Sequence, residues 1–304
     1  MKGDRIFEQA SRMFAILLVV IVASIGFLLL KESLPAIRKF GWQFPFSSIW
    51  DPVAEVFGAW PFLYGTIVSS ILALVIALPL SLGIAIFLAE LAPPYLKAPV
   101  AFLTELLAAI PSVIYGLWGL FFLVPWLRTS VEPFLIKHFG FLPFFKGPPY
   151  GIGMLAAGLI LAIMILPIIS SISREVLQAV PNHQREAALA LGATRWEATR
   201  MAVLRYGKAG LLGAVFLGLG RALGETMAVT MLIGNRPEVS LSLLAPGHTM
   251  ASVIANEFAE ASGPMHLSAL MGVGLALFGT TMVVNAGARF LVWKVSGGRG
   301  EVRE

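Results

Sequence analysis

Long apolar runs recur six times along the chain, separated by shorter polar segments. They occupy residues 13–30, 66–90, 99–126, 151–170, 210–234 and 268–293. Each run reaches the roughly 17 to 25 residues that a membrane-spanning helix needs. None shows the alternating ten-residue pattern of a membrane barrel strand, so only helices can satisfy the backbone within lipid. The pattern predicts an all-α integral membrane protein with six transmembrane helices.

The composition supports this prediction and limits the chemistry. Charged residues make up 13% of the chain and the mean hydropathy is +0.84, whereas soluble domains average about 25% charged residues. The first run exceeds the roughly 7 to 15 apolar residues of a secretory signal and no small-residue cleavage site follows it, so we expect it to be retained. The absence of cysteine excludes disulfides, thiolate metal sites and iron–sulfur clusters. We expect no cofactor and no metal.

The distribution of positive charge predicts the topology. Fourteen of the 22 lysines and arginines lie in the N-terminal tail, the 2–3 loop, the 4–5 loop and the C-terminal end, and seven lie in the opposite loops. By the positive-inside rule, both termini are expected to be cytoplasmic. The net charge of +5 is then a topology signal and does not require a nucleic acid partner.

Two charges stand inside the fifth apolar run. Arg221 and Glu225 are four residues apart, so on a continuous helix they share one face and can pair. A charge at the bilayer centre costs about 2.5 to 3.5 kcal/mol, which favours a position facing the bundle or a wet pathway. A guanidinium can bind two oxygens of a tetrahedral oxyanion at once. Glu225 could hold Arg221 in place or accept a hydrogen bond from an oxyanion that still carries a proton.

An ion pair that only fixes helix packing remains the alternative, because Gly220, Gly224 and Ala228 form a stripe of small residues beside it. Pro111, followed by Ser112 and Tyr115, marks a bend that we expect to border the same pathway. The substrate pathway predicted from the sequence therefore comprises Arg221, Glu225, Ser112 and Tyr115. Near the ends of the runs, Glu90 and Asn285 are expected to be structural.

The connection 173–208 is long and the most charged part of the chain. After Pro181 its apolar positions resume a helical period, and Gly192 marks a turn before a second periodic segment, which predicts a helix, a turn and a helix at the cytoplasmic face. The chain has no phosphate-binding loop, no HExxH motif and no nucleophile elbow. We expect a transport subunit and no enzyme, with ATP hydrolysis in another chain.

The segment "EAALALG" within this connection resembles the EAA motif of ABC importer permeases, E-A-A-x3-G-x9-I-x-L-P, in which a short helix pair docks into a groove of the ATPase. Glu186, Ala187, Ala188, Gly192 and Leu204 match the motif, whereas Ala202 and Arg205 replace its branched apolar residue and its proline. The resemblance implies that Glu186, Ala187, Ala188 and Gly192 couple the chain to an ATPase. A surface amphipathic helix without a partner is the alternative.

Two further segments, "TELLAAIPSVIYGLWGLFFLVP" (104–125) and "LGRALGETMAVTMLIGN" (219–235), resemble the PstC family of membrane subunits in phosphate-specific ABC importers. With the EAA segment, the resemblance extends over most of residues 60–293. It implies the type I ABC importer permease architecture in a bacterial or archaeal cell (inner) membrane. It also implies a second, PstA-like permease subunit, a dimer of PstB-like ATPases and an external PstS-like phosphate-binding protein.

On this basis we expect an N-terminal helix and external segment (1–62), a permease domain (63–293) with the coupling loop 173–208, and a cytoplasmic tail (294–304). The implied function is ATP-driven phosphate import by alternating access, coupled through residues 183–204. Two alternatives stay open: a permease for sulfate or molybdate, and an ATP-independent channel or secondary transporter. The aromatic outer segments 31–62 and 128–149 are expected to pack at the membrane interface or to dock an external partner.

Overall fold

The computed structural model of the protein describes residues 2–261 and 263–296, and these are predominantly helical, as predicted. Six helical segments are long and apolar enough to cross a membrane. They are Phe7–Gln43, Trp60–Leu91, Ser112–Phe139, Met154–Gln178, Arg195–Leu223 and Pro264–Val295. The predicted number of spans is therefore confirmed, although the third and fifth spans differ from the apolar runs in their bounds.

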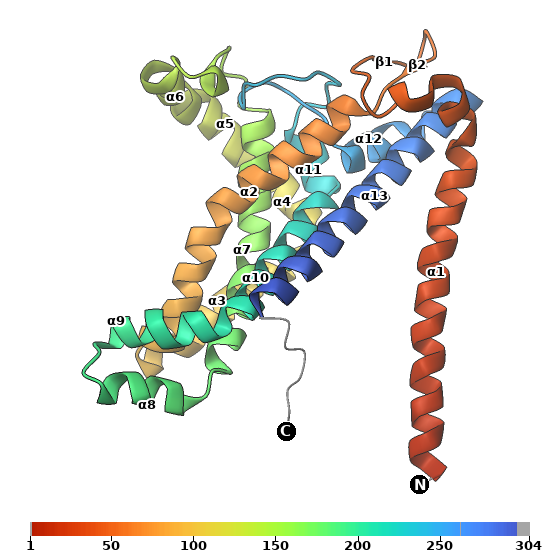
Figure 1. Ribbon diagram of the computed structural model, residues 1–304. Coiled ribbons are helices and arrows are strands. Elements are labelled where there is room, and N and C mark those ends of the chain that lie inside the picture. Colours follow the sequence, from red (N-terminus) through yellow and green to blue (C-terminus); the bar gives the residue numbers. More distant parts are fainter. Residues whose placement is uncertain (1, 262, 297–304) are drawn as a thin grey trace.

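The elements follow one another as shown in Figure 1. The first half contains α1 (Lys2–Phe40), η1 (Gly41–Gln43), β1 (Trp50–Asp51), β2 (Val56–Phe57), α2 (Trp60–Ile86), η2 (Phe87–Leu91), α3 (Pro94–Ala109), α4 (Ser112–Trp118), η3 (Gly119–Leu123), α5 (Val124–Trp126), η4 (Leu127–Val131), α6 (Glu132–Phe139) and η5 (Pro143–Phe145). The second half contains α7 (Met154–Gln178), α8 (Asn182–Ala190), α9 (Arg195–Ala198), η6 (Thr199–Val203), α10 (Leu204–Leu223), α11 (Met227–Leu232), α12 (Met250–Glu257) and α13 (Pro264–Val295).

The centre of the molecule is the packing of α2 against α7, with α10 on α7 and α13 on α10 (Figure 1). Small side chains on α2, including Ala73, Ala77 and Ser81, are fully buried. The Ser81 hydroxyl donates to the Leu166 carbonyl oxygen of α7 at 3.1 Å. Close contact through small residues and interhelical hydrogen bonds is how helices associate in lipid, where apolar burial alone gives no driving force.

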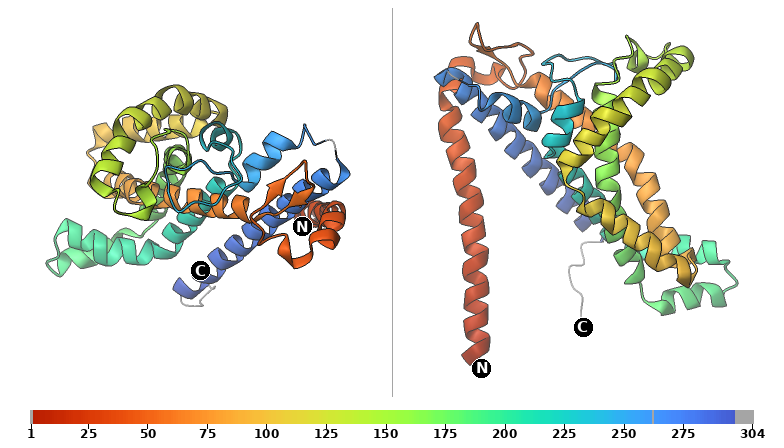
Figure 2. Two further views of the ribbon diagram at one scale, coloured as in Figure 1. Left: turned by 90° about the horizontal axis from the view of Figure 1, so that it is seen from above. Right: turned by 180° about the vertical axis from the view of Figure 1, so that it is seen from behind.

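The first helix stands apart from this core. It packs on α13, and both Figure 1 and Figure 2 show it diverging from the other helices toward its N-terminal end. The contact is fixed by Ser268, which donates to the Glu32 carbonyl oxygen at 2.8 Å and accepts the Ala36 N–H at 3.1 Å. Closer to the middle of α1, a Cβ on Gly26 would lie 3.2 Å from the Phe278 ring, so the two helices cross tightly there.

The two ends of the molecule differ in structure. At one end, called here the hairpin end, β1 and β2 pair antiparallel. Trp50 packs edge-on against Phe57 and Phe62, with centroid distances of 4.9 and 4.8 Å, and its Nε1 donates to Glu257 at 2.9 Å. Part of the aromatic segment 31–62 thus forms a folded cap over the N-terminal ends of α2, α12 and α13. The opposite end, called the α8 end, carries α8 and α9 (Figure 1).

The third span differs from its apolar run because of a proline. Helix α3 ends at Ala109, Ile110 is extended, and the spanning segment begins only at Ser112 and continues to Phe139. A residue before proline is disfavoured in the helical region because the proline ring clashes with it. Pro111 therefore separates two helices, whereas the sequence predicted a bend within one. The segment 128–139, expected as loop, belongs to this span.

His248 lies in the connection between α11 and α12 and is buried. Its Nδ1 lies 2.6 Å from the Ser252 hydroxyl, and its ring packs edge-on against Phe62. Burial lowers the pKa of His248 from 6.5 to about 4, because the charged imidazolium would lose its hydration. The folded chain therefore holds this ring neutral.

We expect the folded state to lose stability in mild acid because of this histidine. The unfolded chain takes up the proton near pH 6.5 and the folded chain only near pH 4, so the contribution is complete above pH 6.5 and is lost as the pH falls toward 4. The loss at pH 5 is about 2 kcal/mol. Thermal unfolding of the detergent-solubilised chain at pH 7.5 and pH 5 measures it. The variant His248→Gln should show a smaller pH difference than the native chain, and an equal difference would contradict the assignment.

Candidate functional site

The EAA segment forms a helix hairpin at the α8 end. Helix α8 begins after Pro181, and Gly192 has a positive φ of +88°, which suits a glycine at this turn. Thr194 and Glu197 then form a capping box that begins α9. The predicted helix, turn and helix are thus present, but the second helix is continuous through η6 with α10. The second helix of the hairpin and the fifth span are therefore one helical segment, Arg195–Leu223.

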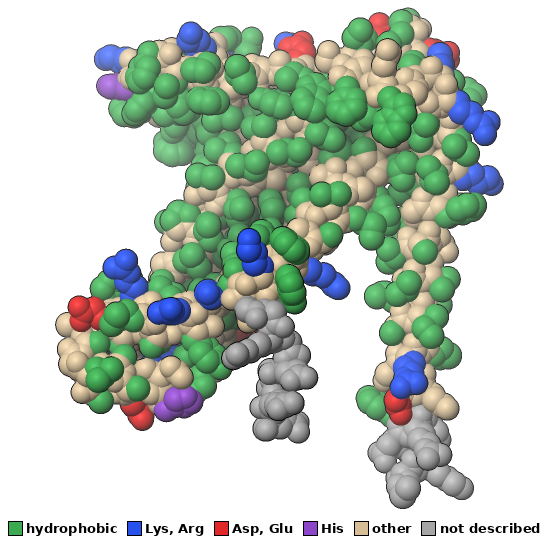
Figure 3. All heavy atoms as spheres, in the orientation of Figure 1, with side chains coloured by type: hydrophobic (Ala, Val, Ile, Leu, Met, Phe, Trp, Pro, Cys, Tyr) green, Lys and Arg blue, Asp and Glu red, His purple; other side chains and the backbone are tan. Residues whose placement is uncertain are grey.

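The residues assigned to ATPase coupling lie on or beside an open groove. Glu186 and Ala187 are exposed and Ala188 is half-buried. A groove of about 510 Å³ between α8 and the α9–η6 segment is lined by Gln184, Ala187, Ala188, Leu191, Gly192, Ala193, Glu197, Met201 and Ala202. Leu191 is 90% exposed and Trp196 is 53% exposed. Figure 3 shows hydrophobic side chains among charged ones over this hairpin, a surface that suits a protein partner.

Arg185 attaches α8 to the spanning helices, a role that the sequence reasoning missed. Its Nη2 lies 2.7 Å from Glu90 Oε1 at the end of the second span and also donates to the Leu177 carbonyl oxygen of α7 at 2.7 Å. Its Nη1 donates to the Val180 carbonyl oxygen, two residues after the end of α7. Glu90, expected to be structural, is thus the partner of the residue directly before Glu186. Both side chains are mostly buried, so α8 is held to α2 and α7 together.

Arg221 and Glu225 form the predicted ion pair, but the backbone between them is not a continuous helix. Helix α10 ends at Leu223, and the chain turns through Gly224 before α11 begins at Met227. The expected continuous helix over 210–234 is therefore wrong. Arg221 Nη2 still lies 3.3 Å from Glu225 Oε2, and the other carboxylate oxygen accepts the Ala228 N–H of α11 at 3.4 Å. Gly224 leaves the helix with φ −95° and ψ 1°, so the break needs no left-handed residue.

The pair is asymmetric in its exposure. The Glu225 side chain is 4% exposed, whereas that of Arg221 is 50% exposed. Glu225 is anchored at the first turn of α11, where a negative charge is favoured. The buried carboxylate therefore contacts one nitrogen of the guanidinium, while half of the Arg221 side chain remains exposed.

Tyr115 and Ser112 do not share this exposed position. Tyr115 is buried, and its hydroxyl donates to the Leu107 carbonyl oxygen of α3 at 2.7 Å, which ties α3 to α4 across the proline break. Ser112 is half-buried at the first position of α4. No contact of the described residues brings either hydroxyl to the Arg221 guanidinium. Their assignment to the substrate pathway therefore stays a prediction.

The two segments that carry the family resemblance pack directly on each other. Helix α4 lies against α11, and a Cβ on Gly116 would lie 2.6 Å from the Met231 sulfur and 3.1 Å from the Ala228 Cα. A Cβ on Gly119 would lie 2.7 Å from the Leu232 side chain. The glycines of segment 104–125 thus leave the space that α11 needs to pack closely. Helix α11 directly follows the turn that contains Glu225.

Comparisons with known proteins agree with this arrangement. Residues 81–292 match the family described as "Binding-protein-dependent transport system inner membrane component". The chain belongs to this family. It is a multi-pass inner membrane protein and a transport component rather than an enzyme.

Within the family, the full-length relatives are phosphate permeases by name. The chain is 47% identical to the phosphate transport system permease protein PstC of Mesorhizobium japonicum, over 98% of this chain and 92% of that protein. It is 46% identical to PstC of Haemophilus influenzae, over 98% and 96%, and 39% identical to the probable PstC of Methanocaldococcus jannaschii, over 89% and 87%.

Two solved structures of the MetNI methionine ABC transporter, described as inward-facing conformations, share the fold. Their TM-scores are 0.53 and 0.57 at 20% and 19% sequence identity. They cover 78% and 81% of this chain and 94% and 99% of the matched chains. At this identity they confirm the ABC importer permease architecture.

Proposed function

We propose that the chain is a permease subunit of an ATP-driven importer that carries inorganic phosphate across the inner membrane. The observation that carries this proposal is the similarity to PstC permeases, at 46–48% identity over nearly the whole chain for several of them. The part-exposed Arg221 held by a buried Glu225 supplies donors suited to a tetrahedral oxyanion within a span. Phosphate would pass this guanidinium on its way through the membrane.

The proposed energy coupling runs through the α8 hairpin. An ATPase seated on the Ala187–Gly192 groove would move α8 when its own dimer closes on ATP. Arg185 and Glu90 would carry that displacement to α2 and α7, and the continuous α9–η6–α10 helix would carry it to the Arg221 turn. The bundle would thereby alternate between its two open states, with no covalent chemistry in this chain.

The proposed assembly contains three kinds of partner. They are a PstA-like second permease subunit, a PstB-like ATPase dimer and an external PstS-like phosphate-binding protein. The family description supports a binding-protein-dependent system, and the exposed apolar side chains of the α8 hairpin support an ATPase contact. Coupling would use Glu186, Ala187, Ala188 and Gly192.

We also propose that both termini are cytoplasmic. Helix α1 begins and α13 ends toward the α8 end in Figures 1 and 2, consistent with the excess of Lys and Arg in these segments. Neither a sulfate or molybdate permease nor an ATP-independent channel is favoured, because the full-length relatives are named as phosphate permeases and the α8 hairpin has no role in a channel.

Uptake of labelled phosphate into vesicles tests the function. The chain is reconstituted with its permease, ATPase and binding-protein partners, and we expect ATP-dependent uptake that excess sulfate does not reduce. Uptake without ATP, or equal competition by sulfate, would contradict the proposal. Omitting only the ATPase should abolish uptake, which separates the importer from a channel.

A further inference from the structure

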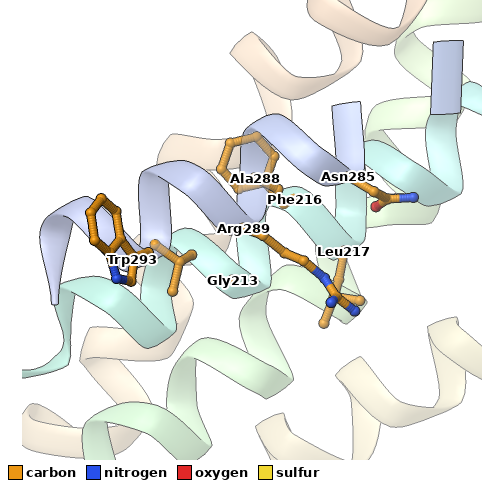
Figure 4. A pocket seen from close by; sticks show the side chains of 8 residues that line it. Gly213, Phe216, Leu217, Asn285, Ala288, Arg289 and Trp293 are labelled. Atoms are coloured by element: carbon orange, nitrogen blue, oxygen red, sulfur yellow. The ribbon is translucent and has the colours of Figure 1, made fainter. Parts of the chain in front are cut away.

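A second groove, distinct from the Arg221–Glu225 pair, lies between α10 and α13 toward the α8 end. Its volume is about 610 Å³, and it is lined by Gly213, Phe216 and Leu217 of α10 and by Asn285, Ala288, Arg289, Val292 and Trp293 of α13. Figure 4 shows the Arg289 side chain reaching toward Leu217, with Asn285 about one turn away on the same helix. The groove thus combines an apolar wall with one cation and one amide.

The register of the two helices connects this groove to Arg221. Helices α10 and α13 run in opposite directions, and Figure 4 places Gly213 toward the Trp293 end and Leu217 toward the Asn285 end. Arg221 follows Leu217 by four residues, about one helical turn. It therefore lies beyond the Asn285 end of the groove. Arg221 does not itself line the groove, but along the helix pair toward the α8 end Asn285 follows it before Arg289.

The charge balance of the groove favours an anion. No Asp or Glu lines it, and none of the ion pairs or side-chain hydrogen bonds within residues 7–261 and 263–296 involves Arg289 or Asn285. Both side chains are exposed. An arginine within a spanning helix needs an acceptor, and its planar fork fits a phosphate group. An asparagine amide adds a further donor.

We infer that this groove binds a phosphate group through Arg289 and Asn285. The group has two possible sources. Free phosphate that leaves Arg221 would bind in this groove before its release at the α8 end. This first source rests on the proposed function. The headgroup of an anionic phospholipid would reach the same donors from the membrane, since Trp293, one turn nearer the end of α13, is a residue type of the membrane interface.

The first test measures ATP-dependent phosphate uptake and ATP hydrolysis by the complete transporter. It uses vesicles of phosphatidylcholine alone and vesicles with added phosphatidylglycerol. The variant Arg289→Gln is compared with Lys294→Gln, which removes an exposed cation of the same helix that does not line the groove. We expect Arg289→Gln to lower uptake about tenfold, as for the loss of one charge-assisted contact, and Lys294→Gln to leave it unchanged.

The lipid composition separates the two sources. If free phosphate binds, Arg289→Gln lowers uptake equally in both kinds of vesicle and raises the phosphate concentration needed for half-maximal uptake. If a headgroup binds, the native chain needs phosphatidylglycerol for full uptake and Arg289→Gln no longer responds to it. If Arg289→Gln matches the native chain in both kinds of vesicle, the inference is overturned.

A binding readout keeps this test independent of transport. Because the sequence has no cysteine, Leu217→Cys places a single thiol of this chain in the groove. In the detergent-solubilised complex, inorganic phosphate or short-chain phosphatidylglycerol should slow its alkylation, and should not do so when Arg289→Gln is also present. Absence of protection by either probe overturns the groove site. Absence of phosphate uptake in the native complex, with protection intact, overturns only the proposed function.

Discussion

Replacing Arg221 with glutamine is expected to lower ATP-dependent phosphate uptake about 100-fold while the complex still assembles. The substitution removes the only charge that faces accessible space in the Arg221–Glu225 pair. Charge-assisted hydrogen bonds contribute about 1.5 to 3 kcal/mol each, and a factor of ten corresponds to 1.4 kcal/mol. Uptake of labelled phosphate, with ATP hydrolysis and pull-down of the partners measured in parallel, checks the result.

The chain offers a matched control for this experiment. Arg12 and Glu8 form another pair with the same spacing of four, at 2.7 Å, but their side chains are 75% and 59% exposed. An exposed ion pair of this kind contributes little to the stability of the folded chain. The variant Arg12→Gln should therefore leave phosphate uptake unchanged. Normal uptake by Arg221→Gln would contradict the prediction. It would mean that the Arg221–Glu225 pair only stabilises the packing around the helix break.

Glu225 can be examined in the same assay. If its carboxylate only holds Arg221, Glu225→Gln should lower phosphate uptake and leave the exclusion of sulfate intact. If it accepts the proton that phosphate carries and sulfate lacks, Glu225→Gln should allow sulfate to compete. The double variant with Arg221→Gln is informative because it removes both charges, and with them the cost of an unpaired carboxylate that is 4% exposed.

Breaking the attachment of α8 should have the second large effect. In Arg185→Gln, the Glu90 carboxylate loses its ionic partner, and α8 loses its charge-assisted hydrogen bonds to the ends of α2 and α7. Removing one member of a mostly buried pair costs several kcal/mol. We expect ATP hydrolysis to continue while phosphate uptake per ATP falls more than about tenfold, measured in the same vesicles.

The pair itself provides the decisive comparison. Glu90→Gln alone should also lower phosphate uptake per ATP. In the double variant Arg185→Gln/Glu90→Gln, the loss should be smaller than the sum of the two single losses, because neither charge is then left without its partner. Lys208→Gln, an exposed cation of α10, serves as the control that should couple normally. Additive effects in the double variant would contradict a direct role of the ion pair.

The sequence predicted those features that depend on composition and local pattern. Six spans follow from hydropathy, and the α8 hairpin follows from Pro181, Gly192 and a resumed helical period. The pairing of Arg221 with Glu225 was also correct, because two opposite charges in an apolar setting have few other partners. In each case the determining residues lie within one short stretch of the chain.

The features that were missed depend on contacts between distant segments. Arg185 and Glu90 are 95 residues apart, and nothing in either local sequence identifies the other. At the break after Leu223 the Glu225 carboxylate accepts the Ala228 N–H of α11, a contact that an apolar pattern cannot reveal. Asn285 was expected to be structural because it lies near the end of an apolar run, yet it is exposed beside Arg289 in a groove that only the pairing of α10 with α13 creates.

The isolated position of α1 has a consequence for biosynthesis. Its hydrogen bonds to the last helix both involve Ser268, more than 230 residues later in the chain, which donates to the Glu32 carbonyl oxygen and accepts the Ala36 N–H. Membrane insertion follows the order of translation, so the first helix enters the bilayer long before its partner exists. Its membrane-spanning part must remain there without the packing against α13 until that helix has been made. The bundle closes only when the ribosome has finished nearly the whole chain.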